Sequence, residues 1–270
     1  VQTVVIEDDH FMGDPKRAHQ VMDLLIKHEM TACFPNALAL YALKKPMLEK
    51  IKRVGVNQLV LAVESGSYEV LHKIMRKPLN LEIVSRVTSD CRDVGIYTDC
   101  NLVIGQPGET IEHLEESREF LRSTYANWFR PNVATPITGS ELLSRSIDGN
   151  YLKGEFSTCD YKKAVIETPD FSAKGLQTIA YLFNLELNFV YNSDLRLGRY
   201  SDALMGFKNA LNAKPDHYFA NKYAALCYAK LGEKEMADKH QQIAKKLSDD
   251  EYWKRWIERV DAPLSEIAHL

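Results

Sequence analysis

Short apolar runs alternate with helix-like segments along the first half of the chain, and each run stops abruptly at polar residues or glycine. The apolar runs predict strands over residues 3–7, 31–35, 58–63, 96–104 and 132–135. Apolar residues at helical spacing predict a helix that opens at Asp14-Pro15, and further helices over residues 47–54, 81–94 and 110–125. Repeated strand–helix units form parallel sheets. We therefore expect an α/β fold in which five strands form one curved parallel sheet with helices on its outer face.

The second half of the chain loses this alternation. Residues 139–174 are rich in Gly, Ser, Thr, Asp and Pro, which indicates a loop-rich connector, and helical patterns alone follow it. The pair Leu197-Gly198 recurs 34 residues later as Leu231-Gly232, which is the tetratricopeptide period. Small residues repeat at the same spacing, Ala203 as Ala237 and Ala210 as Ala244. The predicted division is an α/β part over residues 1–145, a connector over 146–180 and tetratricopeptide-like helices over 181–270.

Two copies of this repeat are fewer than the three or so that sustain a free-standing array. We therefore expect the helices to pack on the first half of the chain, or on residues 253–260 as a capping segment.

Composition and charge exclude several function classes. The formal net charge of −3 gives no basis for binding nucleic acid or an anionic membrane. No apolar run approaches the roughly 20 residues of a membrane span, and the first residues lack the pattern of a signal peptide. The chain opens directly into a strand without an initiator Met, so we expect a fragment of a longer protein. Five scattered cysteines suit a reducing cytoplasm, and Cys91 falls on a helical apolar stripe as a core residue.

The polar residues that end the apolar runs are the candidate site, because ligands of parallel α/β sheets bind at the carboxyl ends of strands. Glu64 ends its strand with no charge near it in sequence. A carboxylate can accept hydrogen bonds from two hydroxyls at once, and Gly66 would let the backbone approach a ligand. A helix cap at Ser67 is the alternative interpretation of this segment, and both can hold together.

The other strand ends are less decisive. Glu7-Asp8-Asp9 could simply favour the amino end of the next helix, but three consecutive acids repel one another without a cationic partner, which favours a functional role. Ile104-Gly105 precedes the tight turn at Pro107-Gly108, and Thr110 would cap the helix that follows. The last strand end runs from Val133 to Ser140.

In their order along the chain, Leu61-Ala62-Val63-Glu64-Ser65-Gly66-Ser67 and Gly105-Gln106-Pro107-Gly108-Glu109-Thr110 resemble strands of the radical S-adenosylmethionine (SAM) enzymes. The resemblance covers about residues 1–145 and is greatest to the elongator-like branch, which includes cobalamin-dependent members. It implies a partial (β/α)6 TIM-like barrel that lacks its first unit, followed by the all-α tetratricopeptide-like helices.

The resemblance also implies roles for individual residues. Glu64 and Ser65 would bind the SAM ribose, Ile104 and Gly105 would meet the adenine, and Asp8 or Asp9 would face the SAM amino group or the substrate. The remaining candidates are Val133 near adenine (core packing explains it equally well), Asn36 at the end of its strand, Lys77 near the SAM carboxylate, and whichever of Asp99 and Asn101 points inward toward substrate.

The activity implied is radical chemistry on an unknown substrate. Three thiolates in a Cys-x3-Cys-x2-Cys motif would hold a [4Fe-4S] cluster, an electron donor such as a flavodoxin or ferredoxin would reduce it, and SAM would yield a deoxyadenosyl radical. None of the five cysteines fits that motif, so we expect the cluster ligands upstream of Val1 and an inactive chain without them. The alternative is a protein-interaction module, in which the helices bind a protein partner and the α/β part is a scaffold.

Overall fold

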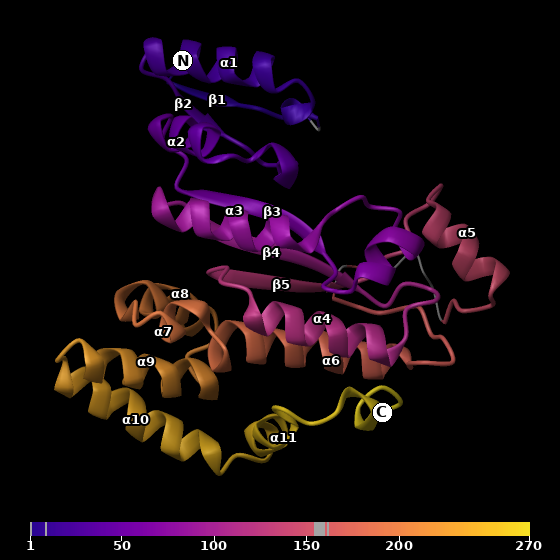
Figure 1. Cartoon of the computed structure of the whole chain (residues 1–270). Helices are drawn as coiled ribbons and strands as arrows, with labels where there is room; N and C mark the ends of the chain where they lie inside the picture. Colours follow the sequence, from indigo (N-terminus) through magenta and orange to yellow (C-terminus); the bar gives the residue numbers. More distant parts are fainter. Residues whose placement is uncertain (1, 9, 154–159, 161) are drawn as a thin grey trace. The chain divides into compact units, whose positions relative to one another are not determined.

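The structure of the chain, a computed structural model, describes residues 2–8, 10–153, 160 and 162–270 (Figure 1). The chain divides into two compact units. The first consists of Val1–Leu102 with Ser123–Arg130, and the second of Val103–Arg122 with Pro131–Leu270. Most strands belong to the first unit and most helices to the second.

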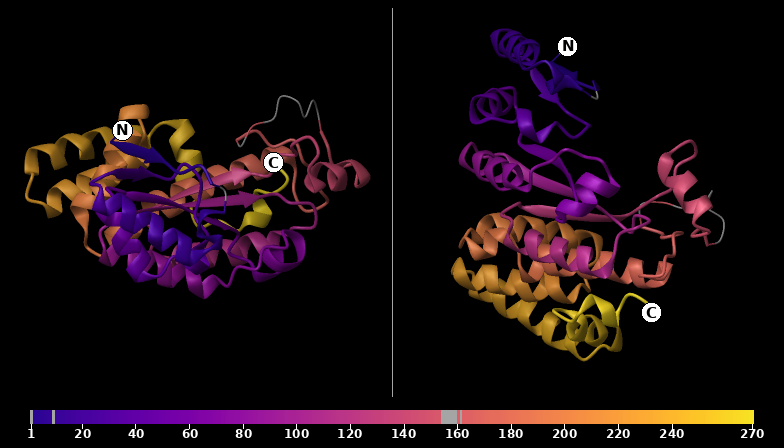
Figure 2. Two further views of the ribbon diagram at one scale, coloured as in Figure 1. Left: turned by 90° about the horizontal axis from the view of Figure 1, so that it is seen from above. Right: turned by 45° about the vertical axis from the view of Figure 1, so that its right-hand side comes forward.

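The first unit is built from parallel strands, as the alternation predicted. β1 (Thr3–Val5) pairs with β2 (Thr31–Cys33), and β3 (Gln58–Glu64) pairs with β4 (Tyr97–Ile104), both in parallel. Both views of Figure 2 show its helices on one side of these strands. The helical elements are η1 (Phe11–Gly13), α1 (Pro15–Lys27), η2 (Leu40–Ala42), α2 (Lys45–Arg53), η3 (Val70–Ile74) and α3 (Leu81–Asp93).

The predicted start of α1 is confirmed. Asp14 is the N-cap, and its side chain accepts a hydrogen bond from the Arg17 amide (3.0 Å). Pro15 occupies the first helical position, where its missing N–H leaves no intrahelical bond unmade.

The expectation of one five-stranded sheet was wrong. The strands form a two-stranded sheet, β1–β2, and a three-stranded sheet in the order β3–β4–β5, where β5 is Trp128–Val133. The Thr31 amide donates toward β1, to the Gln2 carbonyl (2.9 Å). The next amide along the strand, that of Ala32, donates to the Val54 carbonyl at the end of α2 (2.9 Å). Successive amides of a strand point to opposite sides, so on the side away from β1 the Ala32 amide is bonded to the Val54 carbonyl and not to another strand.

β5 begins at Trp128, ahead of the strand predicted from residue 132. Pro131 lies inside β5 and obscured it in the sequence, because proline cannot donate to a strand ladder. β5 ends the strand order of its sheet, and an edge strand tolerates proline.

The two faces of the β3–β4 pair differ in polarity. Leu61 and its register partner Cys100 are fully buried on one face, and burial, with smaller contributions from Asp99 and Cys91, raises the pKa of the Cys100 thiol. Cys91 is also fully buried, which confirms its predicted place in the core. Because side chains alternate along a strand, Asp99 and Asn101 both lie on the opposite face.

The second unit is mainly helical. Its elements are α4 (Ile111–Ser123), which ends in the first unit, α5 (Glu141–Asp148), α6 (Ala173–Leu185), η5 (Glu186–Val190), α7 (Ser193–Arg196), α8 (Tyr200–Ala213), α9 (Tyr218–Lys230), α10 (Lys234–Ser248), α11 (Glu251–Arg259) and η6 (Leu264–Glu266). α5 replaces loop that was expected there; it begins where the Ser140 hydroxyl accepts a bond from the Leu143 amide (3.2 Å).

The helices of the last third follow the predicted period. α8 begins at Tyr200 and α10 at Lys234, the same 34-residue spacing as the two Leu-Gly pairs. Both glycines have left-handed backbone angles, with φ of 71° at Gly198 and 84° at Gly232, as helix ends often require. Trp253 of α11 is buried, and its Nε1 donates to the Asp216 carbonyl just before α9 (3.0 Å). The predicted capping segment, residues 253–260, therefore does contact the helices that precede it.

A buried ionic network joins α4 to η5 and to the turn after α11. The fully buried Glu186 carboxylate accepts hydrogen bonds from Arg118 Nε (2.8 Å) and Nη2 (2.5 Å), Arg122 Nη2 (2.8 Å) and the Asp261 amide (3.0 Å). Arg118 Nη1 also donates to the Ala262 carbonyl (2.8 Å). The C-terminal helices thus pack on the last helix of the α/β part, as expected.

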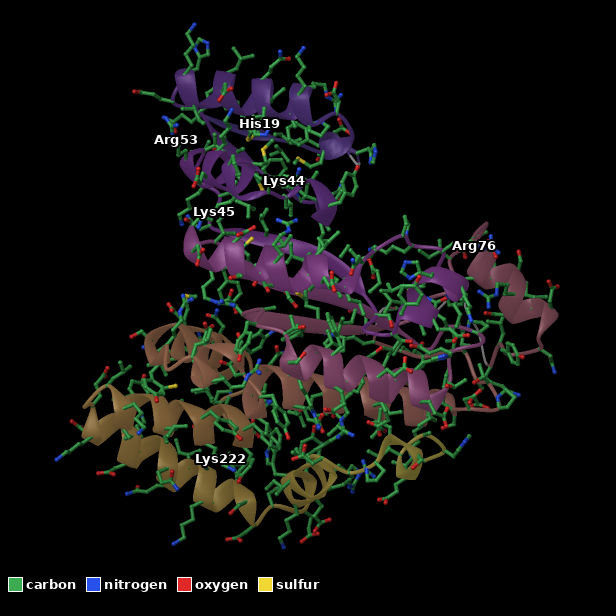
Figure 3. The ribbon with its side chains drawn as sticks, in the orientation of Figure 1. His19, Lys44, Lys45, Arg53, Arg76 and Lys222 are labelled. Atoms are coloured by element: carbon green, nitrogen blue, oxygen red, sulfur yellow. The ribbon has the colours of Figure 1, made fainter. Side chains whose placement is uncertain are left out.

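Charged side chains cover the outer faces of the helices (Figure 3). Lys45 of α2, for example, forms an ion pair with Asp93 at the end of α3 (2.8 Å). Among the residues that the structure describes, no helix has both the length and the apolar character needed to cross a membrane.

Candidate functional site

The candidate site of the first unit begins where β3 ends. The pairing register shifts between Ala62 and Glu64, which marks a β-bulge, and Glu64 itself has a left-handed backbone with φ of 70°. Bulges re-aim the side chains next to them, and left-handed residues other than glycine gather at functional sites. Glu64 is therefore held in a costly conformation at the strand end where the sequence placed a ligand.

Lys77 closes the loop that follows β3. Its Nζ donates to the Ala62 carbonyl (2.6 Å) and to Glu64 Oε1 (3.2 Å). Between these contacts the chain makes the π-helical turn η3, and Arg76, labelled in Figure 3, has φ of 52°. Single π-helical turns are rare in proteins overall, and those that occur are often found at functional sites. Lys77 was expected near the SAM carboxylate, whereas the structure pairs it with the Glu64 carboxylate.

The Glu64 carboxylate has one fixed oxygen and one open oxygen. Oε1 accepts from Lys77, and Oε2 accepts no hydrogen bond from the part of the chain that the structure describes. The side chain is 24% exposed, so a ligand can reach it. Ser65 is buried instead, and its hydroxyl accepts from the Ser67 amide (3.1 Å). Ser65 therefore shapes the turn that presents Glu64.

The acidic cluster after β1 has the cationic partner that the sequence left unnamed. Asp8 Oδ2 pairs with Arg17 Nη2 of α1 (2.8 Å), and Oδ1 accepts from the His10 amide (2.9 Å). The His10 amide, with help from Arg17, lowers the pKa of Asp8. Asn36 donates to the Glu7 carbonyl (3.4 Å), which links the ends of β1 and β2. Asp9 lies outside the described residues.

Two buried acceptors lie on the face of β4 that points away from α3. Asp99 Oδ2 pairs with Arg130 and accepts from Gln58 Nε2 (3.3 Å), but Asp99 Oδ1 and Asn101 Oδ1 have no partner among the described residues. Burial raises the pKa of Asp99. An unsatisfied buried acceptor costs about 1–3 kcal/mol. Both oxygens could therefore accept a hydrogen bond from water or from a bound molecule. Both side chains lie on the same face of β4.

In the second unit, the end of β4 is built around Gly105. Its φ is 90°, and a Cβ at this position would come within 2.1 Å of Leu176 Cδ2 on α6. The backbone angle therefore calls for glycine, and a Cβ would also force the Leu176 side chain to move. The turn that follows is held by Arg145 Nη2, which donates to the Pro107 carbonyl (2.5 Å).

The two backbone groups expected to meet adenine are both used within the protein. The Gly105 amide donates to Glu109 Oε2 (2.6 Å), and the Ile104 carbonyl accepts from the Ala134 amide (2.8 Å). The Gly105 carbonyl accepts no hydrogen bond from the described residues. Val133 is 1% exposed, as the alternative of core packing for this residue predicted.

Glu109 was missed by the sequence interpretation, which gave the turn to glycine and proline alone. Its carboxylate is fully buried, and Oε2 accepts from both the Gly105 amide and the Gln106 amide (3.0 Å). Burial raises the pKa of Glu109 from 4.5 to about 7, although the two amides oppose that shift. A carboxylate that follows a Pro-Gly turn is the signal that could have revealed this clamp.

Glu109→Gln is expected to remove a pH dependence of stability. Because the folded pKa of Glu109 is raised, the folded chain binds more protons than the unfolded chain between pH 4.5 and about 7, so this contribution to stability is lost as pH rises through that range. The loss amounts to about 3 kcal/mol at most. Glutamine keeps the acceptor and cannot ionise, so the variant should match the wild type near pH 5 and exceed it near pH 8 in urea unfolding.

The exposed Glu112 offers a matched control for this experiment. Its pKa is lowered by the free amide at its own helix start, so it does not titrate in the same range. Glu112→Gln should leave the pH dependence unchanged. Equal pH dependence in the wild type and in Glu109→Gln would show that Glu109 is ionised throughout.

The predicted site residues fall in both compact units. Asp8, Asn36, Glu64 and Ser65 belong to the first, and Ile104, Gly105 and Val133 belong to the second. That they share one site stays a prediction.

The cysteines of the described residues do not fit an iron–sulfur cluster. Burial raises the pKa of Cys91 to about 12 and raises the pKa of Cys100 as well, so both are protonated thiols. Within the described ranges, no group of three His, Cys, Asp or Glu side chains could hold a metal ion.

Comparison with known proteins gives a consistent family. A family model described as the radical SAM superfamily matches residues 2–121. Cytidylyl-2-hydroxyethylphosphonate methyltransferase of Streptomyces wedmorensis is 28% identical over 195 residues, which are 68% of this chain and 36% of that protein. An uncharacterized methyltransferase of Pyrococcus horikoshii is 23% identical over 153 residues, 56% of this chain and 33% of that protein. The chain spans about a third of the length of these curated relatives.

Two solved structures are similar at a lower level. The radical SAM methyltransferase of Kitasatospora setae, solved with cobalamin and a [4Fe-4S] cluster, has a TM-score of 0.48 at 13% identity and covers 92% of this chain and 52% of its own. Coproporphyrinogen III oxidase of Escherichia coli, a radical SAM enzyme, has a TM-score of 0.42 at 12% identity and covers 62% and 35%. Both TM-scores are too low to support a conclusion about this chain.

Proposed function

We propose, since this chain belongs to the radical SAM superfamily, that it forms the SAM-binding part of a radical SAM methyltransferase. The observation that carries the proposal is the Glu64 carboxylate, with one oxygen fixed by Lys77 and the other open to a hydroxyl donor. Methyl transfer is taken from the names of the two relatives, of which this chain covers about a third. The substrate is unknown.

The residues of this chain would bind and orient SAM. Glu64 Oε2 would accept hydrogen bonds from the ribose hydroxyls, while the Lys77 ammonium keeps the carboxylate in place. The Gly105 carbonyl, which is open, would accept from the amino group of adenine, and the Glu109 clamp would hold that carbonyl in position. The sequence expectation gave the adenine contact to Ile104 and Gly105 together.

The other cofactors and partners are proposals that rest on the resemblance. Because the described cysteines do not fit a [4Fe-4S] cluster, we place its ligands outside this chain and derive no step through it. The resemblance is also the basis on which we propose cobalamin as a further cofactor, a flavodoxin or ferredoxin as electron donor, and a cytoplasmic location.

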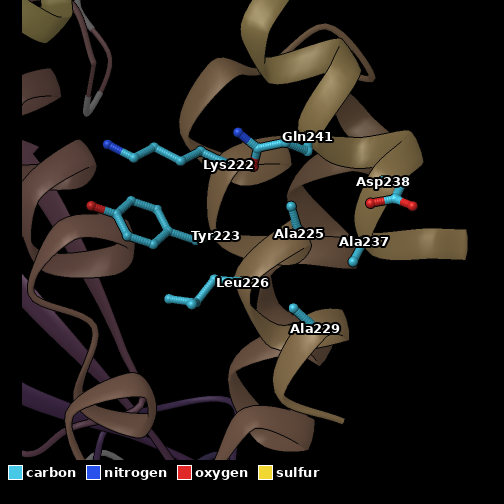
Figure 4. A pocket seen from close by; sticks show the side chains of 8 residues that line it. All are labelled: Lys222, Tyr223, Ala225, Leu226, Ala229, Ala237, Asp238 and Gln241. Carbon is cyan, nitrogen blue, oxygen red and sulfur yellow. The ribbon is translucent and has the colours of Figure 1, made fainter. Parts of the chain in front are cut away.

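The comparisons give no support to the alternative of a non-catalytic interaction module. The helical part does contain a groove of about 410 Å³ between α9 and α10 (Figure 4). Small residues, among them Ala225, Ala229 and Ala237, line this groove together with Lys222 and Tyr223. A protein partner bound to these helices is a proposal that adds to the enzymatic one.

Direct binding tests the proposed function. Isothermal titration of the protein with SAM should give saturable binding, and methionine, which lacks the ribose and adenine, should bind far more weakly. Adenosine should compete about tenfold better than 2′-deoxyadenosine, since 2′-deoxyadenosine lacks one of the two ribose hydroxyls that would bind Glu64. Absence of saturation with SAM at millimolar concentration, or equal competition by the two nucleosides, would contradict the proposal.

A further inference from the structure

A cavity of the first unit lies beside Lys77 and has no role in the proposed function. It has a volume of about 260 Å³ and lies between the segment after β2, residues 37–41, and the start of α3. Ala62 of β3 and residues 77–79 complete its wall. All of these residues belong to one compact unit.

The cavity combines a mostly apolar lining with one charged side chain. Its lining is mostly apolar, with leucine, alanine, proline and isoleucine side chains. Tyr41 adds a phenol ring with a hydroxyl, and Lys77 is the one charged residue that lines the cavity. The Lys77 ammonium has three N–H donors, of which two are used by the Ala62 carbonyl and Glu64 Oε1. The third has no acceptor among the described residues. A mostly apolar cavity therefore presents one charged hydrogen-bond donor, the open N–H of Lys77.

The charge of Lys77 does not make this cavity a site for anions. The ammonium lies 3.2 Å from Glu64 Oε1, so the pair is neutral as a whole. An anion that approached Lys77 would also approach the Glu64 carboxylate, and like charges repel. A neutral acceptor, such as a carbonyl or an ether oxygen, meets the open N–H without that repulsion.

We propose that this cavity binds a neutral, mostly apolar group of about ten non-hydrogen atoms that presents one hydrogen-bond acceptor to Lys77. The size follows from volume, because an apolar cavity of roughly 150 Å³ holds a benzene ring. The binding of this group to the cavity does not depend on the proposed function. That the group belongs to the substrate of a SAM-dependent reaction does rest on the proposed function, since Lys77 also holds Glu64.

Three probes of similar size test the proposal: benzylacetone, a neutral ketone; hydrocinnamate, its anionic analogue; and butylbenzene, which lacks an acceptor. In NMR titrations of the whole chain, benzylacetone should bind with a Kd on the order of 1 mM. Hydrocinnamate should bind at least about tenfold more weakly. Lys77→Met should weaken benzylacetone about tenfold and leave butylbenzene unchanged. Equal affinity for the ketone and the anion would overturn the choice of a neutral ligand.

A cavity-filling variant locates the binding. Ala39→Leu places three extra carbons in the cavity and should abolish benzylacetone binding, whereas Ala213→Leu, at an exposed site on α8, should not. SAM binding should be equal in both variants, so a failure of the cavity proposal can be told from a failure of SAM binding. No binding of benzylacetone at about ten times the expected Kd, or binding that survives Ala39→Leu in a folded protein, would overturn the proposal.

Discussion

Replacing Glu186 with alanine is expected to lower the free energy of unfolding by about 3–5 kcal/mol. Glu186 is fully buried and accepts four hydrogen bonds from Arg118, Arg122 and the Asp261 amide. The side chain of Arg118 is only 4% exposed, so the substitution leaves a buried cation without its principal anion. Removing one partner of a buried ion pair is strongly destabilising for this reason. Urea unfolding followed by circular dichroism measures the loss.

Glu119 provides the matched control. It also forms an ion pair with Arg122, through Nη1 at 3.1 Å, but its side chain is 70% exposed. Glu119→Ala should therefore cost less than about 1 kcal/mol, as exposed pairs do. The double substitution Arg118→Met with Glu186→Leu should recover part of the stability, because no unpaired buried charge from that pair remains. Similar stability of Glu186→Ala and Glu119→Ala would mean that the network contributes little.

The same network connects the C-terminal helices with the turn after β4. Arg118 and Arg122 lie on α4, and α4 begins directly after the Glu109 clamp that holds the Gly105 and Gln106 amides. Gly105 in turn packs against Leu176 of α6. The helical half thus stabilises the strand end that was expected to meet adenine. Loss of the network should loosen this turn before it affects the strands of the first unit.

Local sequence patterns predicted most elements, because strands and helices depend on neighbouring residues. The cap at Asp14 and the parallel pairing of β3 with β4 followed from apolar runs and polar stops. The break between β2 and β3 could not be predicted in this way. The break depends on the acceptor of the Ala32 amide, which is the Val54 carbonyl at the end of α2. The position of that carbonyl depends on how α2 packs, which local sequence does not specify. Pro131 likewise concealed β5 until its edge position was known.

In the candidate site too, local features could be predicted and contacts between distant residues could not. Glu64 was recognised because a lone carboxylate at the end of an apolar strand is unusual in any sequence. Its partner Lys77 was noticed but given another role, since the contact requires the π-helical turn of η3. The Arg118–Glu186 pair joins residues 68 positions apart, and nothing in the local sequence connects them. Contacts between distant segments are therefore the part that the sequence did not reveal.

Glu64→Ala is expected to weaken SAM binding by about ten- to a hundredfold. The substitution removes the carboxylate oxygen proposed to accept from the ribose hydroxyls, and a charge-assisted hydrogen bond of this kind contributes about 1.5–3 kcal/mol. Folding should survive, because the side chain is at the strand end and is partly exposed. Alanine at φ of 70° keeps the backbone strain of Glu64, so the substitution tests the carboxylate alone. Isothermal titration of the variant and of the wild type with SAM measures the effect.

Two further variants show whether the loss is specific to Glu64. Glu69→Ala removes a neighbouring carboxylate that pairs with Lys73 on the surface, at 3.0 Å, and should leave SAM affinity unchanged. Lys77→Met keeps the Glu64 carboxylate but frees it from its anchor, so its effect should be smaller than that of Glu64→Ala. Unchanged affinity in a folded Glu64→Ala variant would show that this carboxylate does not bind the ribose. A loss of equal size in Glu69→Ala would trace the effect to the charge of the loop instead.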